Sequence, residues 1–306
     1  MTRRMRRDVS GWLMIMPQMA GILIFSLIPI GMAILLSFTD ILYVQSNSFS
    51  GMGWVGFGHF SSILSDSLFW KAVLNTFIAA LCVPIQMAFG LLIAVLLGRL
   101  GKRLKRVFRA VLFIPYVSSM VATVFMWQYI FEPNGFINSI ISATGGEKIA
   151  FLTQSEWFLP CIILMMCWSG MGYYIILYEA ALTNVNQSCL EAAELDGAGR
   201  FRRFFSIVLP AISPTTFYLL VMGIINGLQV FTWFQIICAN LGDGFLWGPE
   251  NTGITIVYYI YQMAYVNQFG MGGVGRACAM SVLLVMIIGA LTAINFLFQK
   301  KWVHYD

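Results

Sequence analysis

The sequence predicts an all-α membrane protein, and three observations support this prediction. Hydrophobic residues make up 59% of the 306 residues and charged residues only 10%, whereas a soluble domain has about 25% charged residues. The mean hydropathy is +0.80. The apolar residues also cluster into runs long enough to cross a bilayer, which takes about 20 residues of helix. These features exclude a soluble enzyme, a nucleic-acid-binding domain and a disordered tail.

Six apolar runs of this length are expected to form membrane-spanning helices, because lipid offers no hydrogen-bond partner to an open backbone. The runs are Trp12–Phe38, Ala72–Gly98, Ala110–Phe131, Phe158–Leu182, Pro214–Cys238 and Ala277–Phe298. The first run exceeds the 7 to 15 residues of a signal-peptide core, so it should be a retained anchor. Pro29, Pro84 and Pro115 should kink their helices. Nothing indicates a second domain, so residues 1–306 are expected to form one transmembrane domain.

The basic residues gather on alternate connecting segments. Four precede the first span, six lie between the second and third, three lie between the fourth and fifth, and two follow the sixth. The positive-inside rule makes these segments cytoplasmic, and with them both termini. Lys71, Lys148 and Arg276 remain for the outer side. The net charge of +5 therefore reflects membrane topology rather than a binding patch for an acidic partner.

The outer segment Thr39–Lys71 is too short for a domain of its own. Its apolar residues recur at roughly helical spacing, as in a helix at the membrane interface. These residues are Phe57, Phe60, Ile63, Leu64, Leu68 and Phe69. An interfacial helix and a packed cover over the bundle are compatible interpretations of this pattern.

The chemistry of an enzyme is missing from the sequence. Two histidines, His59 and His304, cannot form a metal site or a catalytic triad, and no phosphate-binding loop of the G-x-x-x-x-G-K-[ST] type occurs. The run Gly270–Gly275 matches a dinucleotide motif but lacks the required strand before it. The six cysteines show no disulfide or zinc spacing and should be small buried hydrophobes. We expect no catalytic residue, no metal and no cofactor in this chain.

Residues 188–214 form the most informative segment. Ser188 and Glu191 have the S-x-x-E spacing of a capping box, and Gly197 or Gly199 supplies the left-handed residue that ends a helix. The pattern predicts a helix of about eight residues. Such a short helix is marginal in water by itself, so we expect it to dock on another surface.

The motifs of this segment resemble the EAA loop of the permease subunits of binding-protein-dependent ABC importers. They are Glu191-Ala192-Ala193, Asp196-Gly197-Ala198 and Leu209-Pro210. Further matches run along nearly the whole chain: Trp54-Val55-Gly56-Phe57, Phe113-Ile114-Pro115-Tyr116, Gly248-Pro249 and Lys301-Trp302-Val303-His304-Tyr305. They are most similar to the carbohydrate-uptake branch. Residues 240–247 are longer than the family usually shows, which leaves the shape of the outer loop 240–252 open.

The resemblance implies a type I importer fold and a set of partners. The chain would form half of a pathway that carries a sugar or oligosaccharide from an extracytoplasmic binding protein across the bacterial inner membrane. The other half would come from a second permease subunit, and two cytoplasmic ATPase subunits would hold ATP and Mg. The loop would be the coupling helix, in which Glu191 pairs with a basic group of the ATPase, Ala192 and Ala193 allow close approach, and Gly197 makes the turn.

The resemblance also implies residues of the substrate pathway. The matching positions are Tyr116, Met120, Gly170, Tyr173, Gly223, Asn226, Gly227 and Val230, with Gln229 and Trp233 as neighbours of the same character. Rings offer a face to sugar C–H groups, amides pair with hydroxyls, and glycines leave room. Helix packing is the alternative role for each aromatic residue. The partner permease, rather than this chain, is also a possible substrate-binding subunit.

Two other classes of function compete with the importer. A self-contained ion-coupled carrier usually needs ionisable groups or unwound helices near the middle of the membrane. Glu179, near the cytoplasmic end of the fourth span, is the one carboxylate within a predicted span. A membrane-embedded enzyme needs a cluster of nucleophile, base or metal ligands, which the sequence does not offer.

Overall fold

The computed structural model describes residues 3–41, 53–266 and 273–304, and within these ranges the regular structure is helical. Two compact units make up the chain. Unit 1 contains the residues up to Ser67 together with Tyr259–Met286, and unit 2 contains Leu68–Tyr258 together with Ile287 onward. Whether residues 1–306 act as one domain stays a prediction.

Unit 1 begins with a long apolar helix that is interrupted once. Its parts are α1 (Arg3–Ile22), the π-helical turn η1 (Leu23–Leu27) and α2 (Ile28–Leu36). The wide turn lies just before Pro29, whose ring would clash with the carbonyl four residues earlier in a regular helix. This is the distortion expected at Pro29. None of the apolar window in Gly11–Leu36 is buried within the chain.

The remainder of unit 1 is α3 (Gly58–Leu64), the π-helical turn η6 (Gln262–Val266) and parts of α15 (Ile256–Tyr261) and α16 (Val274–Trp302). The ring of Phe38 stacks on Trp54 at 5.5 Å and meets Phe57 edge-on at 5.4 Å. Ile63 of α3 is fully buried. The part of the predicted outer cover at 42–52 lies outside the described residues, as do Gly270 and Gly272 of the dinucleotide-like match.

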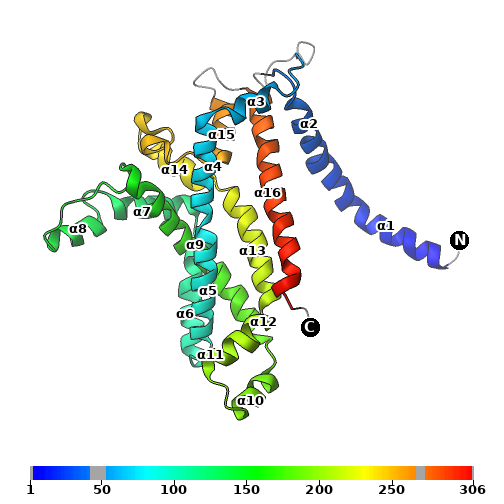
Figure 1. Ribbon diagram of the computed structural model, residues 1–306, viewed down its shortest axis with the longest axis vertical. Coiled ribbons are helices and arrows are strands. Elements are labelled where there is room, and N and C mark those ends of the chain that lie inside the picture. The colour runs from blue at the N-terminus through cyan, green and yellow to red at the C-terminus, as the bar shows by residue number, and fades with distance from the viewer. Residues whose placement is uncertain (1–2, 42–52, 267–272, 305–306) are drawn as a thin grey trace. The chain divides into compact units, whose positions relative to one another are not determined.

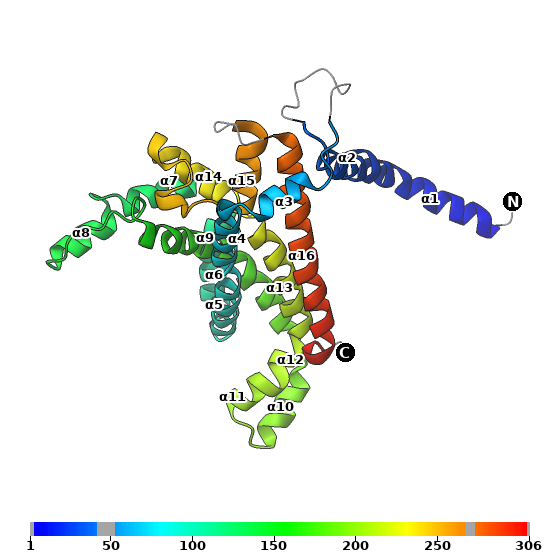
Figure 2. The same ribbon diagram turned by 45° about the horizontal axis from the view of Figure 1, so that its top comes forward.

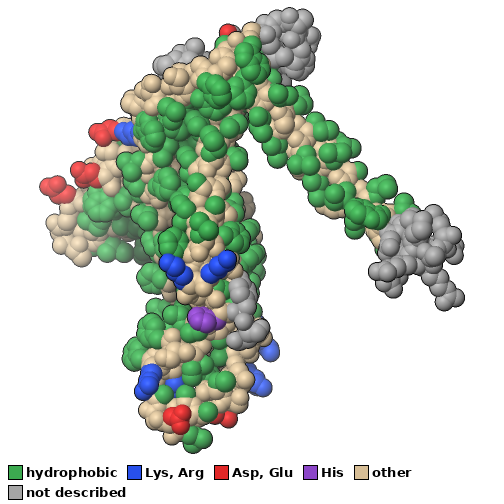
Figure 3. Space-filling view, turned by 45° about the vertical axis from the view of Figure 1, so that its right-hand side comes forward, with side chains coloured by type: hydrophobic (Ala, Val, Ile, Leu, Met, Phe, Trp, Pro, Cys, Tyr) green, Lys and Arg blue, Asp and Glu red, His purple; other side chains and the backbone are tan. Residues whose placement is uncertain are grey.

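Unit 2 contains most of the helices (Figure 1). They are α4 (Ser67–Ala80), α5 (Cys82–Leu97), α6 (Lys102–Val117), α7 (Met120–Phe131), α8 (Phe136–Ala143), α9 (Ser155–Thr183), α10 (Gln187–Leu195), α11 (Arg200–Arg203), η3 (Phe204–Val208), α12 (Leu209–Ala211), α13 (Ser213–Leu228), α14 (Thr232–Asn240), η4 (Asp243–Phe245) and η5 (Pro249–Asn251). In Figures 1 and 2, α10 lies at the opposite end of this unit from α7 and α14. Charged side chains gather toward the ends of the helices, and hydrophobic ones cover the middle (Figure 3).

Five helices are long and apolar enough to cross a membrane: Gly11–Leu36, Ser67–Leu97, Ser155–Thr183, Ser213–Asn240 and Val274–Trp302. A sixth candidate is a bent pair, Lys102–Val117 with Met120–Ala143, whose axes differ by 97°. All six predicted spans therefore have a helical counterpart. The second is interrupted at Leu81, three residues before Pro84, where a kink is expected.

The third predicted span, Ala110–Phe131, is broken a few residues after Pro115 rather than kinked at it. The helix continues through Pro115 to Val117, and the backbone then becomes extended at Ser118 and Ser119. The Ser118 hydroxyl donates to the carbonyl of Ile114 at 2.8 Å, a local bond of the kind by which serine competes with helix continuation. The fifth span is also interrupted, at Gln229–Phe231 between α13 and α14.

The centre of unit 2 is the contact between α5 and α9, which small residues allow. A Cβ atom on Gly90 of α5 would lie 2.7 Å from the Cβ of Tyr174, and one on Gly172 of α9 would lie 2.7 Å from the Leu112 carbonyl oxygen. Membrane helices associate by such close packing because lipid supplies no hydrophobic drive between them. These contacts hold α5, α6 and α9 side by side.

The outer loop 240–252 is short and tightly held. Two amide hydrogens of Asn75 bond the carbonyls of Asn251 at 3.1 Å and Ile254 at 3.0 Å. The Gly253 amide donates to the Trp247 carbonyl at 2.7 Å. Glu250 and Asn251 both have positive φ, a conformation that these bonds maintain. Within 240–247, Asn240 ends α14 and Asp243–Phe245 form the 3₁₀ turn η4.

Candidate functional site

The helix predicted in the segment 188–214 is α10 (Gln187–Leu195), and its first residue differs from the prediction. Asn186 caps it, because the Asn186 Oδ1 accepts from the Ser188 amide at 3.0 Å and from the Ser188 hydroxyl at 2.7 Å. The predicted capping box with Ser188 at the cap position is therefore wrong. Asparagine caps helices as well as serine does, and it stands two residues earlier.

The end of α10 follows the prediction for Gly197. Its φ is +77°, and a side chain at this position would meet nothing within 4 Å. The Gly197 amide donates to the Glu194 carbonyl at 3.0 Å and the Ala198 amide to the Ala193 carbonyl at 2.9 Å. These two bonds form a Schellman motif. Gly199, with φ of −63°, does not take the left-handed conformation.

The predicted coupling residues lie around α10 and the turn after it. Glu191 and Ala192 are exposed. Three others line a hollow of about 260 Å³ between α10 and α11, whose lining is Ala193, Asp196, Ala198, Arg202, Arg203, Ser206 and Ile207. Glu194 accepts from Arg203 across it at 2.6 Å. Leu195 and Phe201 beside it are 89% and 83% exposed, so this end of unit 2 presents apolar side chains without a cover in the chain.

One side of α10 is anchored to the core. Leu190 packs against a buried cluster that includes Tyr178, Val185 and Ile212. Tyr178 belongs to α9, and Ile212 directly precedes α13. The cluster therefore joins α10 to α9 and to the start of α13.

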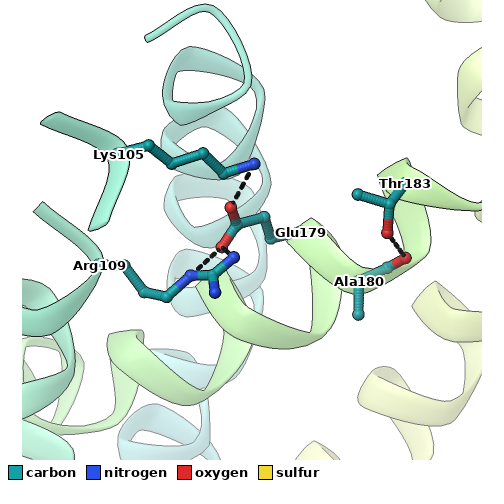
Figure 4. A network of polar contacts seen from close by, with 5 residues as sticks. All are labelled: Lys105, Arg109, Glu179, Ala180 and Thr183. Carbon is teal, nitrogen blue, oxygen red and sulfur yellow. Dashed lines mark hydrogen bonds and ion pairs between the residues drawn. The ribbon is translucent and has the colours of Figure 1, made fainter. Parts of the chain in front are cut away.

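Next to this cluster, the carboxylate of Glu179 joins α9 to α6 (Figure 4). Its Oε2 accepts from the Arg109 Nε at 2.8 Å and Nη2 at 2.7 Å, and its Oε1 lies 2.7 Å from the Lys105 Nζ. Only 4% of the Glu179 side chain is exposed. The one carboxylate within a predicted span is thus buried, and two cations lie against it.

Most of the predicted pathway residues surround one hollow in unit 2, of about 260 Å³. Its lining is Cys82, Val83, Gln86, Tyr116, Ser118, Met120, Met166, Ser169, Gly170, Tyr174, Gly223, Asn226, Gly227 and Trp233. Seven of the ten predicted residues are among them. Ser118 belongs to the break between α6 and α7, and Trp233 follows the break between α13 and α14. Two interrupted helices therefore meet at this hollow, as they do at many transport sites.

Three predicted pathway residues lie outside this lining. The Tyr173 ring stacks on Tyr116 at 5.5 Å, and its hydroxyl lies 3.5 Å from that of Tyr218. The Gln229 amide donates to the Ile225 carbonyl at 3.1 Å. Val230 is buried, and its carbonyl accepts from the Thr255 hydroxyl at 3.0 Å. A contact of these three residues with substrate stays a prediction.

The glycines of the hollow make room for α5. A Cβ atom on Gly170 would lie 2.2 Å from the Gln86 Nε2, and one on Gly223 would lie 2.3 Å from a Val83 methyl. A Cβ atom on Gly227 would lie 3.1 Å from a Val83 methyl and 3.3 Å from the Ala80 Cβ. The expected open space at these positions is therefore filled by a neighbouring helix. The amide of Asn226, by contrast, is exposed.

The sequence-based selection missed residues of α5. Gln86 donates from its Nε2 to the Met166 carbonyl at 2.7 Å and lines the hollow. A signal for it existed: an amide in the middle of an apolar span is costly unless it is hydrogen-bonded. This argument singles out Gln86 in the second span. Tyr174, next to the predicted Tyr173, lines the hollow in its place.

Other titratable groups lie in unit 1. The Tyr259 hydroxyl donates to the Asp66 Oδ2 at 2.7 Å, and the Arg276 Nη2 lies 2.9 Å from the same oxygen. Burial, and then the bond to Asp66, raises the pKa of Tyr259, so its hydroxyl stays protonated. Within the described ranges, no group of three His, Cys, Asp or Glu side chains could hold a metal ion.

Comparison with known proteins gives the class of the chain. Residues 90–302 match the model of the family described as "binding-protein-dependent transport system inner membrane component". The chain belongs to this family. It is therefore an integral membrane protein of a binding-protein-dependent transport system.

Similarity to individual proteins extends over the whole chain. It is 34% identical to the probable ABC transporter permease protein YesP of Bacillus subtilis (strain 168), covering 100% of this chain and 95% of the relative. It is 32% identical to the lactose transport system permease protein LacF of Rhizobium radiobacter, covering 94% and 93%. A crystal structure of a bacterial ABC transporter involved in the import of the acidic polysaccharide alginate superimposes with a TM-score of 0.82 at 24% identity, covering 98% of each chain. This likeness establishes the type I importer permease fold.

Proposed function

We propose that this chain is the membrane-spanning subunit of an ATP-driven importer of a sugar or oligosaccharide in the bacterial inner membrane. It forms half of the translocation pathway. The observation that supports this most strongly is the arrangement of unit 2, in which a helix with an uncovered apolar surface, α10, is packed onto α9 and α13, the helices that line the hollow. Full-length similarity to a lactose permease supports a carbohydrate as the solute.

The partners follow from what the chain lacks and exposes. No phosphate-binding loop occurs in the sequence, so ATP and Mg²⁺ are bound by two cytoplasmic ATPase subunits that dock on α10. The surface that receives them comprises Glu191, Ala192, Leu195 and Phe201. A second permease completes the hollow, and an extracytoplasmic binding protein delivers the solute. The purified chain alone is expected to show no ATPase activity.

The hollow supplies groups suited to a sugar. The Tyr116 ring, which lines the hollow and stacks on the Tyr173 ring beside it, offers a face to C–H groups. The exposed Asn226 offers both a donor and an acceptor to hydroxyls. The neutral lining, made of rings, amides, small residues and thioethers, does not favour the alternative of an ion-coupled carrier. Glu179, the carboxylate that such a carrier would use, is held by two cations.

The variant Gly197→Val tests the coupling role. Valine resists the left-handed conformation at a cost of about 1–2 kcal/mol, so the turn after α10 opens and the docking surface is lost. We expect sugar uptake by the reconstituted transporter to be abolished, while the amount of the chain in the membrane stays near normal. Unchanged uptake would contradict the assignment of α10 as the coupling helix.

Gly199→Val is the matched control. Gly199 lies two residues further on, and its φ of −63° and ψ of 161° suit valine. A side chain there meets nothing within 4 Å. We expect this variant to transport like the unmodified chain, which separates the effect of backbone conformation from that of an added side chain.

A further inference from the structure

One face of α13 stays open beyond the hollow. Asn226, Met222 and Tyr218 stand four residues apart, so they lie in a row along the same side of the helix. All three are exposed within the chain, whereas Leu219 and Gly223 beside them are buried. This row, here called the α13 strip, begins at Asn226 in the lining of the hollow and ends at Tyr218.

The α13 strip leads from the hollow toward the cytoplasm. The basic residues place the segment between α9 and α13 on the cytoplasmic side, so α9 ends there and α13 starts there. Tyr218 stands five residues before Gly223 of the hollow, which is about 7.5 Å along the helix axis. On α9, Tyr173 stands three residues after Gly170 of the hollow, which is about 4.5 Å. Both tyrosines therefore lie on the cytoplasmic side of the hollow.

The side chains of Tyr173 and Tyr218 meet at this level and join α9 to α13. Their hydroxyl oxygens lie 3.5 Å apart, whereas a strong bond between hydroxyls spans about 2.7 Å, so the contact is weak. Each hydroxyl can donate one hydrogen bond and accept two, so a sugar hydroxyl that comes between them gives both tyrosines a partner. The Tyr173 ring also stacks on Tyr116, whose ring lines the hollow. A solute that leaves Tyr116 toward the cytoplasm therefore meets this tyrosine pair next.

The tyrosine pair rests on the core that anchors α10. Tyr173 and Leu190 of α10 pack against one buried cluster, to which Tyr178 and Leu219 belong. Leu219 directly follows Tyr218 on α13. The pair thus lies between the hollow and the helix on which the ATPase subunits are proposed to dock.

We propose that Tyr218 is a further residue of the solute pathway, and that the pair of Tyr173 and Tyr218 closes the hollow toward the cytoplasm until the solute passes. This inference rests on the proposed function and deepens it. An importer that works against a gradient must not open its pathway to both sides at once, because the solute would flow back. The two side chains supply the barrier, and their weak contact lets it open in every transport cycle.

The first experiment measures the closure with a reporter thiol. Met222→Cys places this thiol on the α13 strip between Tyr218 and Asn226, and Cys189→Ser removes the exposed native cysteine. A membrane-impermeant maleimide is applied from the cytoplasmic side to the complete transporter in proteoliposomes, once without nucleotide and once with a non-hydrolysable ATP analogue. We expect the labelling rates in the two states to differ at least fivefold. Equal rates would overturn the closure.

The same reporter assigns the closure to Tyr218. Combined with it, Tyr218→Ala should bring the slower rate to within twofold of the faster one, whereas Tyr218→Phe, which keeps the ring, should preserve most of the difference. Tyr218→Leu serves the same test if the alanine variant does not assemble. A slow rate that persists after truncation of Tyr218 would overturn its role.

Tyr265→Ala is the matched control for this truncation. Tyr265, like Tyr218, is an exposed tyrosine, but it belongs to η6 of unit 1 and does not line the hollow. We expect it to leave both labelling rates unchanged. An effect as large as that of Tyr218→Ala would overturn the assignment to the tyrosine pair.

Sugar uptake separates this inference from the proposed function. Neutral and acidic disaccharides and trisaccharides, lactose included, are tested with the binding protein, and the one that stimulates ATP hydrolysis most strongly is the probe. We expect Tyr218→Ala to lower the amount of this sugar taken up per ATP hydrolysed at least threefold. An unchanged ratio would overturn the closure and leave the importer function intact. If no sugar stimulated the unmodified transporter, the proposed function would fail, while the labelling rates would still test the closure.

Discussion

The carboxylates of Glu179 and Glu194 both lie within 2.7 Å of basic nitrogens, but their surroundings differ. Glu179 joins α6 to α9 with 4% of its side chain exposed, and Glu194 joins α10 to α11 with 67% exposed. Solvent screens the second pair and hardly reaches the first carboxylate. Equal distances therefore correspond to unequal energies: removing a partner from a buried pair costs far more than removing one from an exposed pair.

The buried and the exposed ion pair also lie in different parts of unit 2. The bond between α6 and α9 joins two helices that line the hollow. The ion pair between α10 and α11 is weak. It lies beside a small hollow and beside exposed apolar residues. The pair beside the proposed docking surface is therefore the weaker of the two.

The largest expected effect comes from Glu179→Ala. It leaves Lys105 and Arg109 without their shared carboxylate, and the cost should be about 3 kcal/mol. This value is at the lower end for buried pairs because the two cations still reach solvent. Thermal unfolding of the purified transporter should show a clear loss of stability. A melting temperature equal to that of the unmodified protein would mean that the ion pairs of Glu179 contribute nothing to stability.

The contrast between buried and open surroundings can also be tested with uncharged residues, by adding a methyl group to a glycine in each. Gly223→Ala places a Cβ atom 2.3 Å from a Val83 methyl and 3.0 Å from the Tyr174 hydroxyl. Overpacking of this kind costs about 1–3 kcal/mol, measured by the same thermal unfolding. The double variant with Val83→Ala should recover part of the loss, because it removes the methyl groups that clash.

Gly289→Ala in α16 is the control for this variant, because a Cβ atom there meets nothing within 4 Å. It should be neutral or gain up to about 1 kcal/mol, since alanine favours the helix over glycine. An equal loss in both variants would show that the helical glycines act through the backbone rather than through packing.

The smallest effect is expected for Glu194→Ala. An exposed pair contributes about 0.2–1 kcal/mol, and the double variant with Arg203→Ala should show no greater loss than either single variant. The small difference should vanish in 1 M salt, where the screening length is about 3 Å. A loss as large as that of Glu179→Ala would remove the distinction between the two pairs.

Much of the coupling segment could be predicted from local sequence. Gly197 takes positive φ because the residues before it form a helix and only glycine adopts that conformation without cost. The cap at Asn186 was missed because two residues near the start of α10 can both cap it, and the choice between them depends on where the chain leaves α9.

The hollow was predictable only in part. Tyr116 and Asn226 follow from the resemblance to a family. Gln86 lies on a different helix, α5, and reaches the hollow only because α5 packs against α9. Spacing within one helix cannot reveal which residues of another helix face it.

The sequence by itself determined the membrane class, the approximate limits of six spans and the helix before Gly197. Lipid permits almost no other backbone structure for long apolar runs, so these features depend on local composition. The tertiary structure alone decided the 97° bend after α6, the role of the glycines and the burial of Glu179 between Lys105 and Arg109. The role of the glycines and the burial of Glu179 depend on contacts between residues far apart in the chain, and such contacts form only when the helices have packed.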